Sequence, residues 1–299
     1  MDIIKGIRDY LHEYGRSGER SNAKLKAFHG FFNNEIISKL EYCLGMNGYG
    51  YGLADGTERT ITFSNGITWK SDACFTLVNR DLEKNGGLID YKCPMASISQ
   101  NEGNIMATLK ALSSDARPEK WVFSSVILVP NKIPSFEEAK NTNGVCWRKS
   151  KLDSPDKFIE KCERWMTDNV KRDNRPDHLL IIVYDLPDIT DEMWKGVKTK
   201  EDYYHILKEY DGKIRLVQPM VKVKETESFM INKCEDFVKR FSDSVSRMCH
   251  DRNTFKIDEK LIEFSREEPA KVHRFLVENG KISPAAMPET TKYQYVYQK

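Results

Sequence analysis

The stretch "GLIDYKCP", Gly87 to Pro94, places an aspartate and a lysine two residues apart within an apolar, strand-like run. Successive side chains of a β-strand point to opposite faces of the sheet. Asp90 and Lys92 should therefore project from one face, while Ile89 and Tyr91 project from the other. We expect the first of these faces to carry a charged site.

A second acid lies on the strand expected to precede this one. The segment "TITFSNGITWKSD" contains two short β-rich runs around Asn65-Gly66, a strong hairpin-turn dipeptide, and is followed by the apolar "ACFTLV". Asp72 therefore begins one strand, and Asp90 lies within its expected neighbour. If the two strands pair antiparallel, their carboxylates converge at one end of the sheet.

Two carboxylates brought together in this way need a counter-charge. Like charges ~4 Å apart cost ~4 kcal/mol at an effective dielectric near 20, and a single lysine cannot neutralise both. Mg²⁺ prefers carboxylate oxygens, a backbone carbonyl and waters, and it bridges to phosphate. With Lys92 on the same face, the set suits phosphodiester hydrolysis. We predict Mg²⁺ as the cofactor, with Mn²⁺ as a substitute, and Asp72 and Asp90 as its ligands.

Composition limits the remaining choices. The chain has 299 residues, is 39% hydrophobic and 31% charged, and so indicates a folded protein with a substantial core. It contains no apolar run of membrane-spanning length and no signal-peptide pattern at its start, which predicts a cytoplasmic, intracellular protein without a membrane partner. The seven cysteines show no zinc-ligand spacing. Nucleotide-binding loops and a serine-hydrolase elbow are also absent from the sequence.

The order of the expected elements predicts the fold class. Apolar spacing predicts a helix over residues 22–44, with Glu35 at the edge of its apolar stripe, and a second helix over residues 97–114. Buried strands are expected at 120–130 and 178–187. Strands alternating with helices indicate an α/β or α+β fold with a mixed central sheet flanked by helices. We expect this core over residues 1–190 and a mostly helical C-terminal region, for DNA recognition or dimerisation, over 191–299.

These residues resemble the PD-(D/E)xK nuclease superfamily. Ser71-Asp72, a 17-residue gap and Asp90-Tyr91-Lys92 match its motif, although serine stands where the family usually has proline. The surrounding elements follow the order of that family's core over roughly residues 22–130. Within the family, "LKAFHGFFNNEIISKL" and "LIDYKCPMAS" are most similar to EcoRV-like type II restriction endonucleases.

The resemblance implies a restriction-endonuclease-like core and a Mg²⁺-dependent enzyme that cuts double-stranded DNA at a specific site. It makes Asp72 and Asp90 metal ligands, Lys92 the catalytic lysine and Glu35 an auxiliary catalytic acid. A restriction enzyme of this kind should act as a homodimer that matches a palindromic site. The alternative for the same residues is a surface ion pair between Asp90 and Lys92, with Asp72 as a turn residue.

Basic clusters in loop-like segments are candidates for nucleic-acid contacts. They contain Arg148, Lys149, Lys151, Lys171, Arg172 and Arg175. Two further functions remain open. The segment "HGFFNNE" together with "LIDYK" also resembles the cap-snatching RNA endonuclease domains of segmented negative-strand viruses, a resemblance that would add His29 to the metal site around Mn²⁺. The other alternative is a catalytically inactive nucleic-acid-binding protein.

Overall fold

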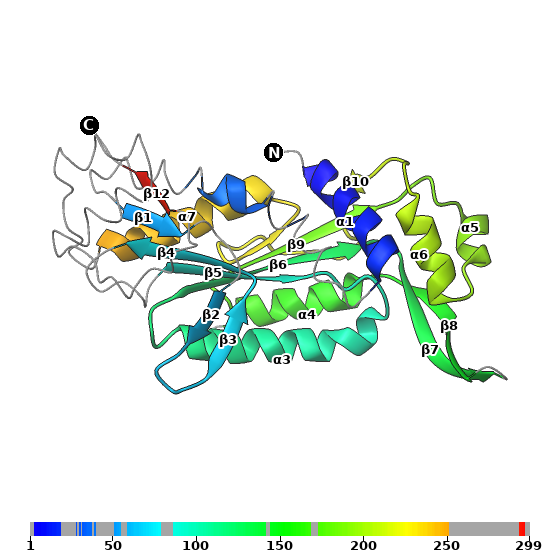
Figure 1. Ribbon diagram of the computed structural model, residues 1–299, viewed down its shortest axis with the longest axis horizontal. Coiled ribbons are helices and arrows are strands. Elements are labelled where there is room, and N and C mark those ends of the chain that lie inside the picture. The colour runs from blue at the N-terminus through cyan, green and yellow to red at the C-terminus, as the bar shows by residue number, and fades with distance from the viewer. Residues whose placement is uncertain are drawn as a thin grey trace.

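A mixed eight-stranded sheet forms the centre of the molecule (Figure 1). The computed structural model describes residues 3–18, 28, 30, 32–37, 39, 51–54, 59–78, 86–141, 144–168, 173–250 and 293–296. The strand order is β10-β9-β6-β5-β4-β1-β12, and β11 pairs with β9. The predicted mixed α+β architecture, with a mixed sheet between helices, is confirmed.

Parallel pairing at the centre of the sheet gives way to antiparallel pairing on either side. The three central strands β5, β6 and β9 run parallel, and β4 pairs antiparallel with β5. On the outside, β1 pairs antiparallel with both β4 and β12, and β10 pairs antiparallel with β9, whereas β11 runs parallel to β9. The bounds of these strands are β1 Tyr51–Ala54, β4 Ala73–Val78, β5 Gly86–Lys92, β6 Val122–Pro130, β9 His178–Asp185, β10 Arg215–Leu216, β11 Phe229–Ile231 and β12 Tyr293–Val296.

Helices cover both faces of this sheet (Figure 1). α3 (Ile98–Ala116) and α4 (Asp156–Thr167) lie on one face, where each connects two parallel strands. α1 (Ile3–Ser17) and α7 (Cys234–His250) pack on the other face, together with helical residues 32–37. The sheet therefore separates two hydrophobic clusters, and alternate residues of each central strand belong to different clusters.

Two hairpins lie beside the sheet (Figure 1). β2 (Arg59–Thr62) and β3 (Thr68–Ser71) form the predicted hairpin, and Gly66 adopts a φ of 80° in its turn. β7 (Ile133–Asn141) pairs antiparallel with β8 (Gly144–Asp153).

The β7–β8 hairpin corrects one prediction. Arg148, Lys149 and Lys151 lie on strand β8, so the expectation that this basic cluster forms a loop was wrong. Polar residues on both sides of this strand hide the alternation by which a half-buried strand is recognised.

Residues beyond 190 contribute to the same body. α6 (Lys200–Lys208) begins with a capping box between Thr199 and Asp202 and packs against α1, while α7 packs against β5, β6 and β9. The short α5 (Asp191–Gly196) precedes α6. None of the helices in the described ranges combines the length and apolar character needed to cross a membrane. The domain boundary at 190 stays a prediction.

Gly87 marks the tightest contact between α7 and the sheet. A Cβ atom at this position would lie 2.2 Å from Cζ of Phe241 and 2.9 Å from Cγ2 of Val245. We expect Gly87→Ala to lower the free energy of unfolding by ~1–3 kcal/mol, because the added methyl group overpacks a filled core.

Gly103 is the matched control, because a Cβ there meets no atom within 4 Å. Gly103→Ala in the middle of α3 should raise the free energy of unfolding by ~0.5–1 kcal/mol. Urea denaturation measures both changes, and a Gly87→Ala protein as stable as the wild type would contradict the described packing.

Candidate active site

Asp72 and Asp90 meet where β4 begins and β5 approaches its end. Ala73 faces Ile89 in the antiparallel register, and extending that register by one residue places Asp72 opposite Asp90. The Tyr91 amide donates a hydrogen bond of 2.8 Å to Oδ2 of Asp72. This contact between the two strands holds the Asp72 side chain against β5, as the antiparallel arrangement predicts.

Lys92 completes the cluster from the same strand face as Asp90. Its Nζ lies 2.9 Å from Oδ1 of Asp90, and its side chain is 27% exposed, against 2% for the Asp90 side chain. Ser125, on the neighbouring strand β6, donates a hydrogen bond of 2.9 Å to the Asp90 carbonyl. The Asp90 carboxylate is therefore buried, while the Lys92 ammonium group reaches towards solvent.

The second carboxylate oxygen of Asp90 has no hydrogen-bond donor. Oδ2 is buried, and no described residue donates to it. The carboxylate of Asp72 is its charged neighbour, and Asp72 can donate a hydrogen bond only when it is itself protonated. A buried carboxylate oxygen in this position needs a proton or a cation to compensate for lost hydration.

The burial of Asp90 and its closeness to Asp72 shift the pKa values of the cluster. The pKa of Asp90 is raised to about 6, chiefly by burial; the charge of Lys92 lowers it, and the neighbouring Asp72 adds to the rise. Burial alone would lower the pKa of Lys92, but the charges of Asp90 and Asp72 outweigh it and raise that pKa. Lys92 therefore stays protonated at neutral pH, while Asp90 ionises at a higher pH than an ordinary aspartate and at a cost in stability.

A cavity of about 360 Å³ opens at the Lys92 side of the cluster. Lys92 lines it together with Tyr14 of α1 and with Asn101, Asn104 and Thr108 of α3. None of these three polar residues is among the site residues predicted from the sequence. Their spacing of three and four places them on one face of a helix, and this is the signal that links them to the site.

Glu35 is not brought into the cluster. Its helix, residues 32–37, packs on the opposite sheet face, where Asn33 accepts a hydrogen bond of 2.9 Å from the Tyr91 hydroxyl. No group of three His, Cys, Asp or Glu side chains that could hold a metal is assembled among the described residues. His29 lies outside the described residues.

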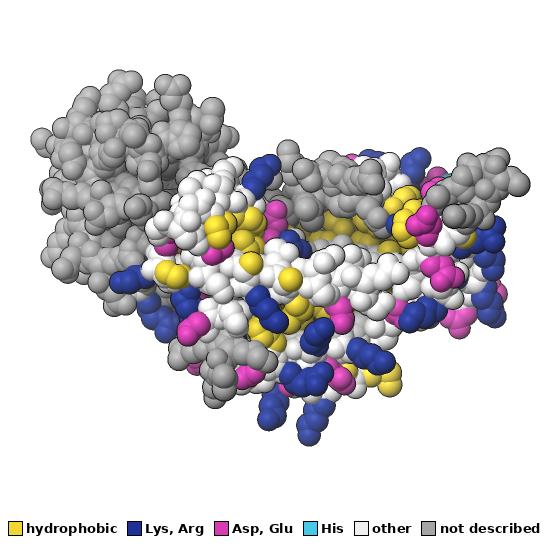
Figure 2. All heavy atoms as spheres, turned by 90° about the horizontal axis from the view of Figure 1, so that it is seen from below, with side chains coloured by type: hydrophobic (Ala, Val, Ile, Leu, Met, Phe, Trp, Pro, Cys, Tyr) yellow, Lys and Arg dark blue, Asp and Glu magenta, His cyan; other side chains and the backbone are white. Residues whose placement is uncertain are grey.

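The three basic residues of β8 that were predicted to contact nucleic acid differ in their exposure and in their partners. Arg148 is exposed, Lys149 donates to the Trp194 carbonyl, and Lys151 pairs with Asp153 at 2.9 Å. Burial, followed by the charge of Lys198, lowers the pKa of Lys149. In Figure 2, Lys and Arg side chains lie along this face of the molecule, and at the end that carries β8 and α5 they are mixed with Asp and Glu side chains.

Arg175 has a structural contact instead. Its guanidinium donates to the Met166 carbonyl at the end of α4, one of the last helix carbonyls that lack a partner within the helix. Lys171 and Arg172 lie outside the described residues.

Comparisons of this chain with protein-family models, curated proteins and solved structures find no significant match. The similarity to PD-(D/E)xK nucleases thus stays a resemblance carried by Asp72, Asp90 and Lys92. The geometry and charge of these three side chains are the basis for assigning a function.

Replacing Asp90 should stabilise the metal-free protein. The folded-state pKa of Asp90, about 6, lies above the ~3.9 of an unfolded chain. The folded state therefore binds the proton more tightly, and its stability falls as pH rises from about 4 to about 6. The loss is on the order of 2–3 kcal/mol. Asp90→Asn cannot ionise, so in EDTA at pH 7.5 it should unfold at higher urea than the wild type.

The difference should shrink at pH 4, where the wild-type side chain is protonated. Asp191→Asn is the control, because the Asp191 side chain is 76% exposed. Equal stability of Asp90→Asn and wild type at both pH values would show that Asp90 carries no such penalty.

Proposed function

We propose that the protein is an intracellular Mg²⁺-dependent endonuclease that hydrolyses double-stranded DNA, a type II restriction enzyme of the PD-(D/E)xK kind. The observation that carries the proposal is the buried, donor-free Oδ2 of Asp90, which lies beside Asp72 in a cluster that also holds a protonated Lys92. A carboxylate with a perturbed pKa, paired with a cation that lines a cavity, is typical of functional sites.

The donor set fits a magnesium ion. Asp72 and Asp90 would hold it, and two carboxylates are enough because Mg²⁺ keeps several waters and also binds substrate phosphate. When bound, Mg²⁺ supplies a polarised phosphoryl oxygen and an acidified water. The same ion would offset both the burial and the repulsion from Asp72 that raise the pKa of Asp90.

Lys92 would act through its charge. Because Asp90 and Asp72 keep it protonated, its ammonium group donates hydrogen bonds and is not a general base. Its contact with Oδ1 of Asp90 fixes the ammonium group beside the carboxylates, and its exposed side reaches the cavity. There it would orient the attacking water or stabilise negative charge on the phosphoryl oxygens.

The Tyr91 amide positions Asp72, the first of the two acids. By donating to Oδ2 of Asp72, it ties the first acid to the strand that carries the second. The distance between the two carboxylates therefore follows from the pairing of β4 with β5. This arrangement would present both acids to one phosphate without movement of the backbone.

Cleavage assays test the proposal directly. Purified protein should cut unmethylated phage DNA into discrete fragments with Mg²⁺, but not with Ca²⁺ or EDTA. Asp90→Ala and Lys92→Ala should each lose at least ~100-fold in rate, because they remove a metal ligand and a charge that act in the transition state. Lys132→Ala is the matched control, since Lys132 forms an exposed ion pair with Asp191 and does not line the cavity beside Lys92.

The other substrates decide between the alternatives. Cleavage of single-stranded RNA that prefers Mn²⁺ would replace this proposal with a cap-snatching type of endonuclease. Binding of DNA without cleavage of either substrate would favour a catalytically inactive nucleic-acid-binding protein. An Asp90→Ala protein that cuts like the wild type would exclude the site.

Arg148 tests the expected contact with duplex DNA. It is exposed on β8, and Lys200 of α6 lies beside the same strand, with its Nζ 4.2 Å from the ring centre of Trp147. Arg148→Ala should weaken DNA binding in Ca²⁺ to a similar degree for all sequences and lower the salt dependence of log K by ~1. Fluorescence anisotropy at several salt concentrations measures both effects. An unchanged salt slope would remove Arg148 from the interface.

Binding to a palindromic site would also involve two copies of the chain. The proposed enzyme is accordingly a homodimer when it acts on DNA. Analytical ultracentrifugation with a cognate duplex would show two chains per duplex, and one chain per duplex would contradict a symmetric restriction enzyme.

A further inference from the structure

A second polar cavity lies at the other end of the parallel strands. It has a volume of about 460 Å³ and is lined by Arg117, Lys120, Trp121, Val122, Arg175, Pro176, Asp177, His178, Ser228 and Ser244. Val122 pairs with Gly87 at the start of β5, whereas Lys92 ends that strand. Five residues of strand, roughly 16 Å, separate this cavity from the Asp90 cluster.

Two hydrogen-bond donors at this cavity are buried without acceptors. Trp121 is 4% exposed, and its indole nitrogen has no hydrogen-bond partner among the described residues. Nε of Arg117 is also buried without a partner. Indole and guanidinium nitrogens are donors only, so both positions lack an acceptor. Buried donors are normally paired, and such exceptions indicate a missing ligand, ion or water.

The charges around the cavity are mainly positive. Arg117, Lys120 and Arg175 line it, and Asp177 is the one acid among its described lining residues. The Asp177 carboxylate is already engaged, since it accepts a 2.9 Å hydrogen bond from the Phe123 amide and lies 3.5 Å from the Arg117 guanidinium. A negatively charged acceptor would complement this set better than a neutral one.

The pKa of His178, another residue that lines the cavity, is also affected by nearby positive charges. Its pKa is lowered to about 4, chiefly by burial and also by the charges of Arg240 and Arg247, against an opposing contribution from the Glu227 carbonyl. Neutral at pH 7, His178 shares a hydrogen bond of 2.9 Å with the Ser244 hydroxyl. Cations from α7 therefore add to those that line the cavity.

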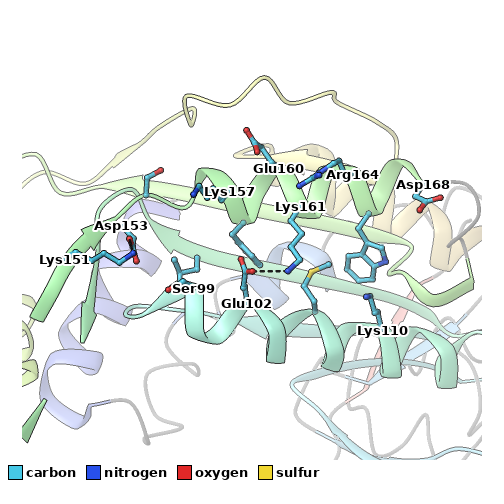
Figure 3. Close-up of a pocket in the computed structure, with 15 residues that line it drawn as sticks. Ser99, Glu102, Lys110, Lys151, Asp153, Lys157, Glu160, Lys161, Arg164 and Asp168 are labelled. Carbon is cyan, nitrogen blue, oxygen red and sulfur yellow. Dashed lines mark hydrogen bonds and ion pairs between the residues drawn. The ribbon is translucent and has the colours of Figure 1, made fainter. Parts of the chain in front are cut away.

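The groove between α3 and α4 provides a contrast (Figure 3). It also holds a buried indole nitrogen without a partner, that of Trp165. There, however, Lys161 points towards Glu102 and pairs with it at 3.0 Å, and Lys151 pairs with Asp153 at 2.9 Å. Its cations alternate with acids, so that groove does not select an anion.

We infer that the cavity at Trp121 and Arg117 binds a phosphate group, either as inorganic phosphate or as part of a nucleic acid. The two donors would both bind its oxygens. The Arg117 side chain is 33% exposed, its pairing with Asp177 is long, and its guanidinium also donates a 3.2 Å hydrogen bond to the Arg175 carbonyl. Lys120, exposed and held at a φ of 60° between α3 and β6, would add charge at the entrance. This inference does not depend on the proposed nuclease activity.

Isothermal titration calorimetry with inorganic phosphate, in EDTA and at constant ionic strength set with chloride, tests the inference. Wild-type protein should bind phosphate saturably, one per chain. Trp121→Phe removes one donor and should weaken binding several-fold, and Arg117→Gln should weaken it about tenfold or more, because a charged donor is lost. Trp165→Phe, the matched indole control, should bind phosphate like the wild type.

Lys120→Gln is a third variant, which changes an exposed side chain and so leaves the packing of the core unchanged. Its side chain is exposed, so the variant should fold normally and still bind phosphate more weakly. A parallel titration compares an oligonucleotide carrying a 5′-phosphate with the same oligonucleotide lacking it. Tighter binding of the phosphorylated oligonucleotide that is lost in Trp121→Phe would identify a nucleic-acid phosphate as the ligand. Equal binding of the two oligonucleotides would identify free phosphate as the ligand.

Absence of saturable binding of both inorganic phosphate and the phosphorylated oligonucleotide would overturn the inference. Phosphate binding that Trp121→Phe, Arg117→Gln and Lys120→Gln all leave unchanged would overturn it as well. Neither result bears on cleavage, because these titrations contain EDTA and the Asp90 cluster keeps its wild-type residues.

Discussion

A buried carboxylate beside a second carboxylate is the constraint on which the rest of this structure depends. Asp90 lies within a sheet strand that is covered on both faces, and its pKa of about 6 reflects burial first, opposed by the charge of Lys92 and reinforced by that of Asp72. Lys92 compensates only one of its oxygens. The fold thus keeps a site that costs stability without a cation, which is the usual trade-off between a stable core and a functional site.

The alternation of β5 makes this site compatible with a hydrophobic core. Ile89 and Tyr91 pack into the hydrophobic cluster on the sheet face that α1 and α7 cover. Leu88 packs into the hydrophobic cluster on the other face, which α3 and α4 cover. Asp90 and Lys92 share the second face but lie nearer the end of the strand, where a cavity opens beside α3. The core remains continuous on both sides, and Lys92 reaches solvent where the strand ends while Asp90 stays buried.

The two ends of the parallel strands differ in chemistry. The carboxyl end of β5 gathers acids and one lysine, which suits a cation. The amino end of β6 gathers buried donors and cations, which suits an anion. In an enzyme that acts on phosphodiesters, both ends would bind parts of a phosphate-bearing substrate by opposite means, through a bridging metal at one end and through direct hydrogen bonds at the other.

The sequence by itself determined the local features: the hairpin at Asn65-Gly66, the mixed sheet between helices, and the shared face of Asp90 and Lys92. Turn chemistry and side-chain periodicity are local, so they can be recognised without a structure. Only the tertiary structure decided which distant groups meet. It paired Asp72 with the Tyr91 amide, kept Glu35 apart from the acids, formed a strand from the polar β8, and assembled the cavity around Trp121 from separate segments. Such contacts depend on strand register and helix packing, which a linear pattern of residue types does not contain.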